Sequence, residues 1–175
     1  MIEWLKQFFG SSQQTEAVAV APEQVRVPPE KGWSKSIEDC HVELRRAFPK
    51  VRDEFESAHP DCRLLVDYTY RSPEVQFELY KKGRTILRGQ WVVTDPKHVV
   101  TQKDGLIKRS EHNFYPSRGA DIYVVKNGKI LWGTSEEEHP YYVELGRLWE
   151  REGIVSGATW KYAWKDFGHV QVAQA

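Results

Sequence analysis

The stretch that decides the fold is SEHNFYPSRGADIYVVKNGKILW, residues 110–132. Residues 119–125 within it are rich in β-branched and aromatic side chains, which is typical of a strand. Asn127-Gly128 is a strong signal for a two-residue hairpin turn, after which the chain returns as a partner strand. The stretch therefore predicts an antiparallel hairpin, with His112 just before it and Asp121 on its first strand.

The sequence before the hairpin predicts two helices and a strand. Residues 36–39 resemble a capping box that opens the first helix, whose apolar pattern continues past Pro49, a kink or a restart. Residues 63–69 predict a strand. Ser72-Pro73 joins an N-cap to a proline at the first helical position, and Gly83 suits the position after the end of that helix.

The rest of the chain predicts one more helix and two short strands. Residues 84–112 lack a clear period and are interpreted as a long loop. Residues 141–152 predict a helix, and residues 160–164 and 168–172 predict the final strands. Strands and helices follow one another without a regular β-α-β rhythm. The expected fold class is therefore α+β, with a small antiparallel sheet flanked by helices.

Composition excludes several classes of function. With 175 residues the chain suits a single domain, and its 25 basic and 25 acidic residues give no global positive field, so no nucleic acid is expected as a partner. Cys40 and Cys62 are expected to be free buried thiols, although pairing stays open. Motifs of serine hydrolases, phosphate-binding loops, His-Glu-x-x-His zinc enzymes and EF-hands are absent from the sequence.

The N-terminal part differs from the remainder in composition. Residues 1–33 are interpreted as an amphipathic segment followed by a linker, and residues 34–175 as the functional domain. Residues 1–10 could make a weak membrane or partner contact, or could be a loosely packed tail. The segment lacks the features of a signal peptide and is too short to span a bilayer, so no integral membrane span is expected.

The candidate metal ligands and the candidate catalytic acid lie in two segments, residues 110–121 and Asp166-Phe-Gly-His169. His112, Asp121 and His169 form a set of two imidazoles and one carboxylate that suits Zn²⁺ and leaves a fourth position open for water. Asp166 is then a spare carboxylate that can move the proton of that water. For Asp166 the alternative is a turn residue that bonds its own backbone, and for each histidine it is an ordinary hydrogen-bonded side chain.

These motifs resemble those of the M15 zinc peptidases, the group of D-Ala-D-Ala carboxypeptidases and L-alanyl-D-glutamate endopeptidases. Residues 110–121 are similar to the first zinc motif, in the longer spacing of bacteriophage and prophage members, and residues 166–171 resemble the closing motif. Residues 70–85 resemble the Arg-Ser-x-x-x-Gln segment. The resemblance covers roughly residues 34–172. Two departures are Asp in place of the more usual Glu at position 166, and Gly119-Ala120, which is expected to loosen the strand locally.

The resemblance implies a fold of the hedgehog and DD-peptidase type and one Zn²⁺ per chain, held by His112, Asp121 and His169. It implies that Asp166 is the general base and that Arg71 stabilises an oxyanion or holds a substrate carboxylate. Supporting roles around the site fall to Ser110 and Gln76.

The function that the resemblance implies is zinc-dependent hydrolysis of peptide bonds in the stem peptides of bacterial peptidoglycan. An L-Ala-D-Glu endopeptidase of the phage-lysin type is expected first, and a D-Ala-D-Ala carboxypeptidase is the alternative. An alternative of another class is a non-catalytic, zinc-stabilised module that binds the cell wall. Without a signal peptide, a phage lysin would remain in the host cytoplasm before its release to the wall.

Overall fold

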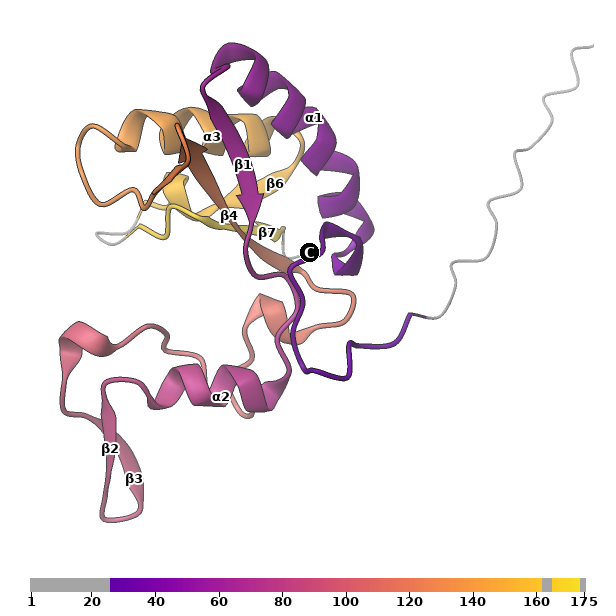
Figure 1. Cartoon of the computed structure of the whole chain (residues 1–175). Helices are drawn as coiled ribbons and strands as arrows, with labels where there is room; N and C mark the ends of the chain where they lie inside the picture. The colour runs from indigo at the N-terminus through magenta and orange to yellow at the C-terminus, as the bar shows by residue number, and fades with distance from the viewer. Residues whose placement is uncertain (1–25, 162–164, 174–175) are drawn as a thin grey trace, which may run out of the picture.

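An antiparallel sheet of five strands forms the body of the computed structural model, which describes residues 26–161 and 165–173 (Figure 1). Its strand order is β1-β4-β7-β6, and β5 pairs with β4. The strands are β1 Cys62–Val66, β4 Gly119–Lys126, β5 Lys129–Leu131, β6 Ile154–Ser156 and β7 His169–Val172. The predicted α+β class with a small antiparallel sheet is confirmed.

Strand β4 is the centre of this sheet because it pairs along both halves. Its C-terminal half pairs with β1 and β5, and its N-terminal half pairs with β7. The register places Asp121 directly opposite His169. The hairpin from β4 to β5 turns through Asn127 and Gly128, with φ of 49° and 77°, as the sequence predicts.

Two helices, α1 Val42–Ala58 and α3 His139–Arg151, cover one face of the sheet (Figure 1). Their buried side chains recur every three to four residues, which makes one apolar stripe on each helix. Phe48 and Trp149 stack between the helices with ring centroids 6.4 Å apart. The alternate residues Ala120, Ile122 and Val124 of β4 join the same core. Asp121 and Tyr123 lie on the other face of β4, because strand side chains alternate between faces, although the Tyr123 ring still packs against this core.

The predicted start of the first helix is wrong by several residues. Ser36 caps only a 3₁₀ turn, η1 Ile37–Asp39, and α1 begins at Val42 with His41 as its N-cap. The chain between these elements is hydrogen-bonded to a distant segment, because His41 N donates to Ser117 O and Ser117 N donates to Asp39 O. That pairing holds the backbone extended and delays the helix.

Pro49 does not restart the helix, and α1 runs unbroken through it. The side chain of Pro49 is exposed. On the solvent side of a helix, a missing backbone hydrogen bond is tolerated because the carbonyls there can turn toward water. The second helix, α2 Pro73–Lys81, begins and ends as the caps predict, with Ser72 Oγ accepting from Val75 N and Gly83 at a φ of 74°.

The expected long loop after α2 contains a hairpin. Strands β2 Arg84–Leu87 and β3 Gln90–Val93 pair through a turn at Arg88 and Gly89, whose φ values are 51° and 77°. The chain then forms two short 3₁₀ turns, η2 Pro96–His98 and η3 Glu111–Asn113. Helix α2 and the hairpin lie apart from the sheet, and residues 73–108 are called the arm below (Figure 1).

Two further sequence predictions need correction. Strand β1 ends at Val66. Asp67 N still donates to Asp121 O in register, but Asp121 N donates to Tyr68 O and not to Asp67 O, so the regular ladder stops there. The predicted strand over 160–164 is not seen in its described part, because Trp160 follows a 3₁₀ turn, η4 Gly157–Thr159, and Lys161 lies in a bend. Residues 162–164 lie outside the described residues. On the side away from β4, β7 pairs with β6, a strand that was not predicted from the sequence.

Both cysteines are free and buried, as expected. In the described part of the chain, no helix has the length and apolar character needed to cross a bilayer. The amphipathic run of residues 1–10 lies outside the described residues, and the boundary between residues 33 and 34 stays a prediction. Near that boundary, Trp33 forms an isolated bridge with Arg71, and Ser72 N donates to Gly32 O.

Candidate metal centre

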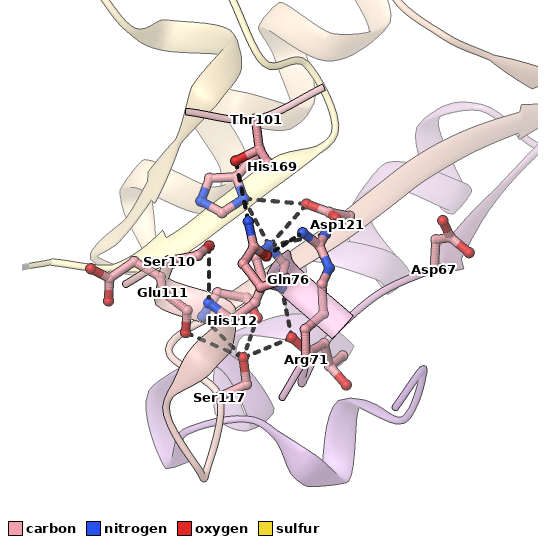
Figure 2. Close-up of polar contacts among 12 residues, drawn as sticks. Asp67, Arg71, Gln76, Thr101, Ser110, Glu111, His112, Ser117, Asp121 and His169 are labelled. Atoms are coloured by element: carbon pink, nitrogen blue, oxygen red, sulfur yellow. Dashed lines mark hydrogen bonds and ion pairs between the residues drawn. The ribbon is translucent and has the colours of Figure 1, made fainter. Parts of the chain in front are cut away.

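Three side chains from distant parts of the chain meet on the face of β4 that points away from the helices (Figure 2). His112 comes from η3, Asp121 from β4 and His169 from β7. His112 Nε2 lies 3.3 Å from His169 Nδ1, and Asp121 Oδ1 lies 3.2 Å from each of these nitrogens. All three ligand atoms thus fall within 4.8 Å of one another.

The orientation of His112 is fixed by hydrogen bonds to residues that are not metal ligands. Its Nδ1–H donates to the backbone carbonyl of Thr69 at 2.6 Å, and the ring is 2% exposed. Ser110 caps the short turn that carries this histidine, and its Oγ accepts from His112 N at 3.4 Å. Ser110 therefore acts on the backbone, not on the imidazole. Burial lowers the pKa of His112, so the ring is neutral and Nε2 presents a lone pair to the site.

His169 is oriented by its own strand. Its Nε2–H donates to Gln171 Oε1 at 3.0 Å, two residues along on the same face of β7. Gly119 lies beneath the ring, where a Cβ would come within 3.1 Å of His169 Cε1. The expected loosening of the strand at Gly119-Ala120 is wrong, because β4 is regular there and pairs with β7. The small residue instead gives the imidazole room.

The donor set fits a divalent cation. Because the outer nitrogens of both rings are engaged, the inner nitrogen of each ring can offer a lone pair to a cation, beside one carboxylate oxygen of Asp121. Lone pairs at such distances repel one another unless a proton or a cation lies among them. Two nitrogens and one carboxylate oxygen form a common three-ligand set for Zn²⁺, with a fourth position free for another ligand.

Arg71 lies at the edge of this group, and its guanidinium donates to Oδ2 of Asp121 (Figure 2). Burial would raise the pKa of Asp121, but the nearby His112, His169 and Arg71 outweigh it and hold that pKa well below its usual range. Asp121 is therefore a carboxylate. The Nε of Arg71 is buried and has no hydrogen-bond partner among the described residues.

Gln76 connects Arg71 to the arm. Its Oε1 accepts from Arg71 at 3.3 Å, while its Nε2 donates to Thr101 Oγ1 at 3.2 Å and to Lys103 O at 3.0 Å. The side chain is completely buried, so it supports the site and does not face outward. Gly105 packs against it so closely that a Cβ there would lie 2.8 Å from Gln76 Cβ.

Asp166 lies beside the group but does not join it by a direct bond. Its backbone makes the turn into β7, with Asp166 O accepting from His169 N at 3.2 Å. Its carboxylate makes no hydrogen bond to another side chain in the part of the chain described here, so the turn does not depend on it. Asp166 is a solvent-exposed residue, but the protein that surrounds its carboxyl group raises the pKa of Asp166. The charge of His169 lowers this pKa, and the charge of Asp121 raises it further.

Three residues near the site were not found from the sequence: Thr69, Gln171 and Tyr123. Strand alternation could have indicated two of them, since Gln171 shares a face with His169 and Tyr123 shares one with Asp121. The Tyr123 ring lies against Gly168, where a Cβ would come within 2.5 Å of it. Burial and the charges of Asp121 and Asp166 raise the pKa of Tyr123, so it carries a neutral hydroxyl.

No protein family model and no curated protein sequence matches this chain. Among solved structures, the chain is similar to the L-Ala D-Glu endopeptidase ChiX of Serratia marcescens, with a TM-score of 0.51 and 18% sequence identity. The similarity covers 78% of this chain and 83% of ChiX. At this level of identity the comparison shows that the two proteins share a fold.

Proposed function

We propose that this protein is a zinc-dependent peptidase that hydrolyses peptide bonds in the stem peptides of bacterial peptidoglycan. The observation that carries the proposal is the convergence of His112 Nε2, Asp121 Oδ1 and His169 Nδ1, each within 4.8 Å of the others. A structural zinc site usually has four protein ligands, whereas a catalytic one keeps a position open. Three ligands beside a spare carboxylate favour catalysis.

The residues divide the work as follows. His112, Asp121 and His169 would hold the metal, and Zn²⁺ when bound would supply a Lewis acid that lowers the pKa of water from 15.7 to about 7. Asp166, whose raised pKa lies closer to neutrality than that of an ordinary carboxyl, takes the proton from the attacking water. Arg71, held by Asp121 and Gln76, faces the developing oxyanion or a substrate carboxylate.

We propose the bond between L-Ala and D-Glu as the scissile bond. The motif spacing in residues 110–121 supports this choice, and so does the shared fold with an L-Ala D-Glu endopeptidase. A phage or prophage lysin is the proposed biological setting. The protein would then accumulate in the host cytoplasm before it reaches the wall.

The test is digestion of purified peptidoglycan followed by mass spectrometry of the released fragments. We expect new N-terminal D-Glu, no release when a chelator is present, and recovery on addition of Zn²⁺. Released D-Ala would instead identify a carboxypeptidase. Binding to peptidoglycan without any new termini would identify a non-catalytic wall-binding module and contradict the proposed function.

A further inference from the structure

The arm carries most of the large apolar side chains that are exposed in the described residues. Of eleven large apolar side chains that are exposed there, seven lie between Ile86 and Ile107. At the tip of the β2–β3 hairpin, Ile86 is 55% exposed and Leu87 is 51% exposed. Exposing aliphatic side chains to water at the end of a projecting element is unfavourable in free energy. Such a cluster indicates a surface that binds a partner.

The hairpin has one face packed and one face open. On the packed face, Trp91 meets Phe77 of α2 edge to face at 5.9 Å, and the Arg84 guanidinium lies 4.0 Å from the centre of the Tyr80 ring. The register pairs Ile86 with Trp91, so Ile86 lies on the packed side, but at the tip it is still 55% exposed. The opposite face carries the pairs Thr85 with Val92 and Leu87 with Gln90. In Figure 1 this hairpin stands away from the sheet, and no other described element lies over its tip.

The segment from the end of α2 onward is positively charged, although α2 itself adds two acids, Glu74 and Glu78, to the arm. Residues 81–109 hold eight basic and two acidic residues, in a chain whose totals are 25 of each. Both acids are engaged locally: Asp95 contacts His98 at 2.6 Å, and Asp104 accepts from three backbone N–H groups at 2.7, 2.7 and 2.9 Å. Lys82, Arg88 and Lys97 are exposed and form no ion pair within the described residues.

We infer that the β2–β3 hairpin is a docking surface for an anionic phospholipid bilayer, with Ile86 and Leu87 entering the headgroup region and Arg88 meeting lipid phosphates. The combination of the two properties selects this partner. A polyanionic glycan or peptide would satisfy the cations but leave the aliphatic tip in water, whereas the bilayer interface accepts both. The inference goes beyond the proposed peptidase activity and does not depend on it.

The test is co-sedimentation of the full-length protein with vesicles. Equimolar phosphatidylcholine and phosphatidylglycerol vesicles should bind it, pure phosphatidylcholine vesicles should bind it weakly, and added salt should weaken the binding by screening the charges. Two variants keep the hairpin intact. Ile86→Thr with Leu87→Thr removes the apolar tip but retains strand-forming residues. Arg88→Asn removes the charge and creates an Asn-Gly turn, which suits the two positive φ values.

Each arm variant should lower the partition coefficient by about ten-fold, as expected for losing one apolar or ionic anchor at a membrane surface. Leu65→Thr on β1 and Arg147→Gln on α3 remove a matched exposed group elsewhere and should bind like the wild type. Unchanged binding by both arm variants would overturn the inference. Binding to purified peptidoglycan in place of vesicles, lost in the same variants, would also overturn it. Hydrolysis and melting temperature of each variant separate these outcomes from misfolding and from failure of the proposed function.

Discussion

Arg71 donates a hydrogen bond to Oδ2 of Asp121, the carboxylate oxygen that does not face the two histidines. The carboxylate thus serves two neighbours at once. Its Oδ1 completes the group formed by His112 and His169, and its Oδ2 holds a guanidinium that Gln76 supports from the other side. This arrangement links the metal ligands to the arm through a continuous set of polar contacts.

The first prediction concerns Arg71. Arg71→Ala should lower turnover by about 10²-fold, the loss typical of removing one donor to a developing oxyanion. Arg71→Lys should recover little, because a single ammonium cannot contact Asp121 and Gln76 and also face a substrate. Steady-state kinetics, zinc content and melting temperature should be measured together.

Arg84→Lys is the matched control, since Arg84 is also buried but binds Tyr80 O and Gln102 in the arm. Arg84→Lys should lower the melting temperature and leave the turnover per folded molecule unchanged. Full activity of Arg71→Ala would remove Arg71 from the proposed mechanism.

The second prediction is that metal binding releases a proton from His169. Burial lowers the pKa of His169, but the hydrogen bond and charge of Asp121 outweigh burial and raise it above its ordinary value. In the metal-free protein, therefore, the ring is protonated below that raised pKa, and the cation must displace the proton. Zinc affinity should rise with pH and level off above the pKa.

Calorimetry in buffers of different ionisation enthalpy measures the number of protons released. His112→Ala should lose the metal, while His98→Ala, which removes an exposed imidazole on the arm, should keep it. Zinc affinity that does not vary with pH between 5 and 8, the range in which histidine usually titrates, would contradict the prediction.

The sequence predicts the local features of this fold well because they depend on neighbouring residues. The Ser72 cap, the Gly83 helix end and the Asn127-Gly128 turn are each set within a few positions of chain. The β2–β3 hairpin was missed since Arg88 occupies a position with φ of 51°, where glycine, asparagine or aspartate is the usual signal. A residue that adopts an unfavoured conformation gives no sequence signature of the turn.

The assembly of the site depends on pairings over long distances in the chain. Motif spacing indicates His112, Asp121 and His169 as candidates, but only the β4–β7 register places Asp121 opposite His169. The contact between His112 and Thr69 joins residues 43 positions apart, and no local pattern carries it. The residues that orient the metal ligands by hydrogen bonds are therefore identified from the fold and not from the motifs.

The third prediction tests one of these supporting residues, Gln171. Gln171→Leu removes the acceptor for His169 Nε2–H, which should free the imidazole to change tautomer and rotate. Zinc affinity should fall by about 10- to 100-fold, the usual cost of losing an outer partner of a metal ligand. Gln171→Glu keeps an acceptor and should retain the affinity.

Chelator competition measures this affinity, and Gln90→Leu, at an exposed position on β3, is the matched control. The melting temperature of the metal-free variants should match that of the metal-free wild type. Equal zinc affinity for Gln171→Leu and the wild type would show that the strand alone fixes the ring.

The last prediction separates catalysis from binding, and it depends on Asp166. Asp166→Asn should keep the metal, because His112, Asp121 and His169 remain. Turnover should fall by about 10²- to 10⁴-fold, the usual contribution of positioned proton transfer. In the wild type, activity should decline on the acid side at a higher pH than for an ordinary carboxyl, because the folded protein raises the pKa of Asp166. At saturating Zn²⁺, the Asn variant should lose the part of this acid limb that comes from Asp166, while the part that comes from proton uptake by the metal ligands should remain.

The same pKa shift fixes the sign of the effect on stability. An acid whose pKa is raised by folding destabilises the folded state at neutral pH, where it is charged, and this penalty disappears as the pH falls below the ordinary carboxyl pKa. Asp166→Asn should therefore keep or raise the melting temperature at pH 7. Asp53→Asn, at an exposed position on α1, should change neither turnover nor zinc content. A joint loss of stability and activity in Asp166→Asn would make Asp166 a structural residue, and unchanged hydrolysis would remove it from the proton-transfer step.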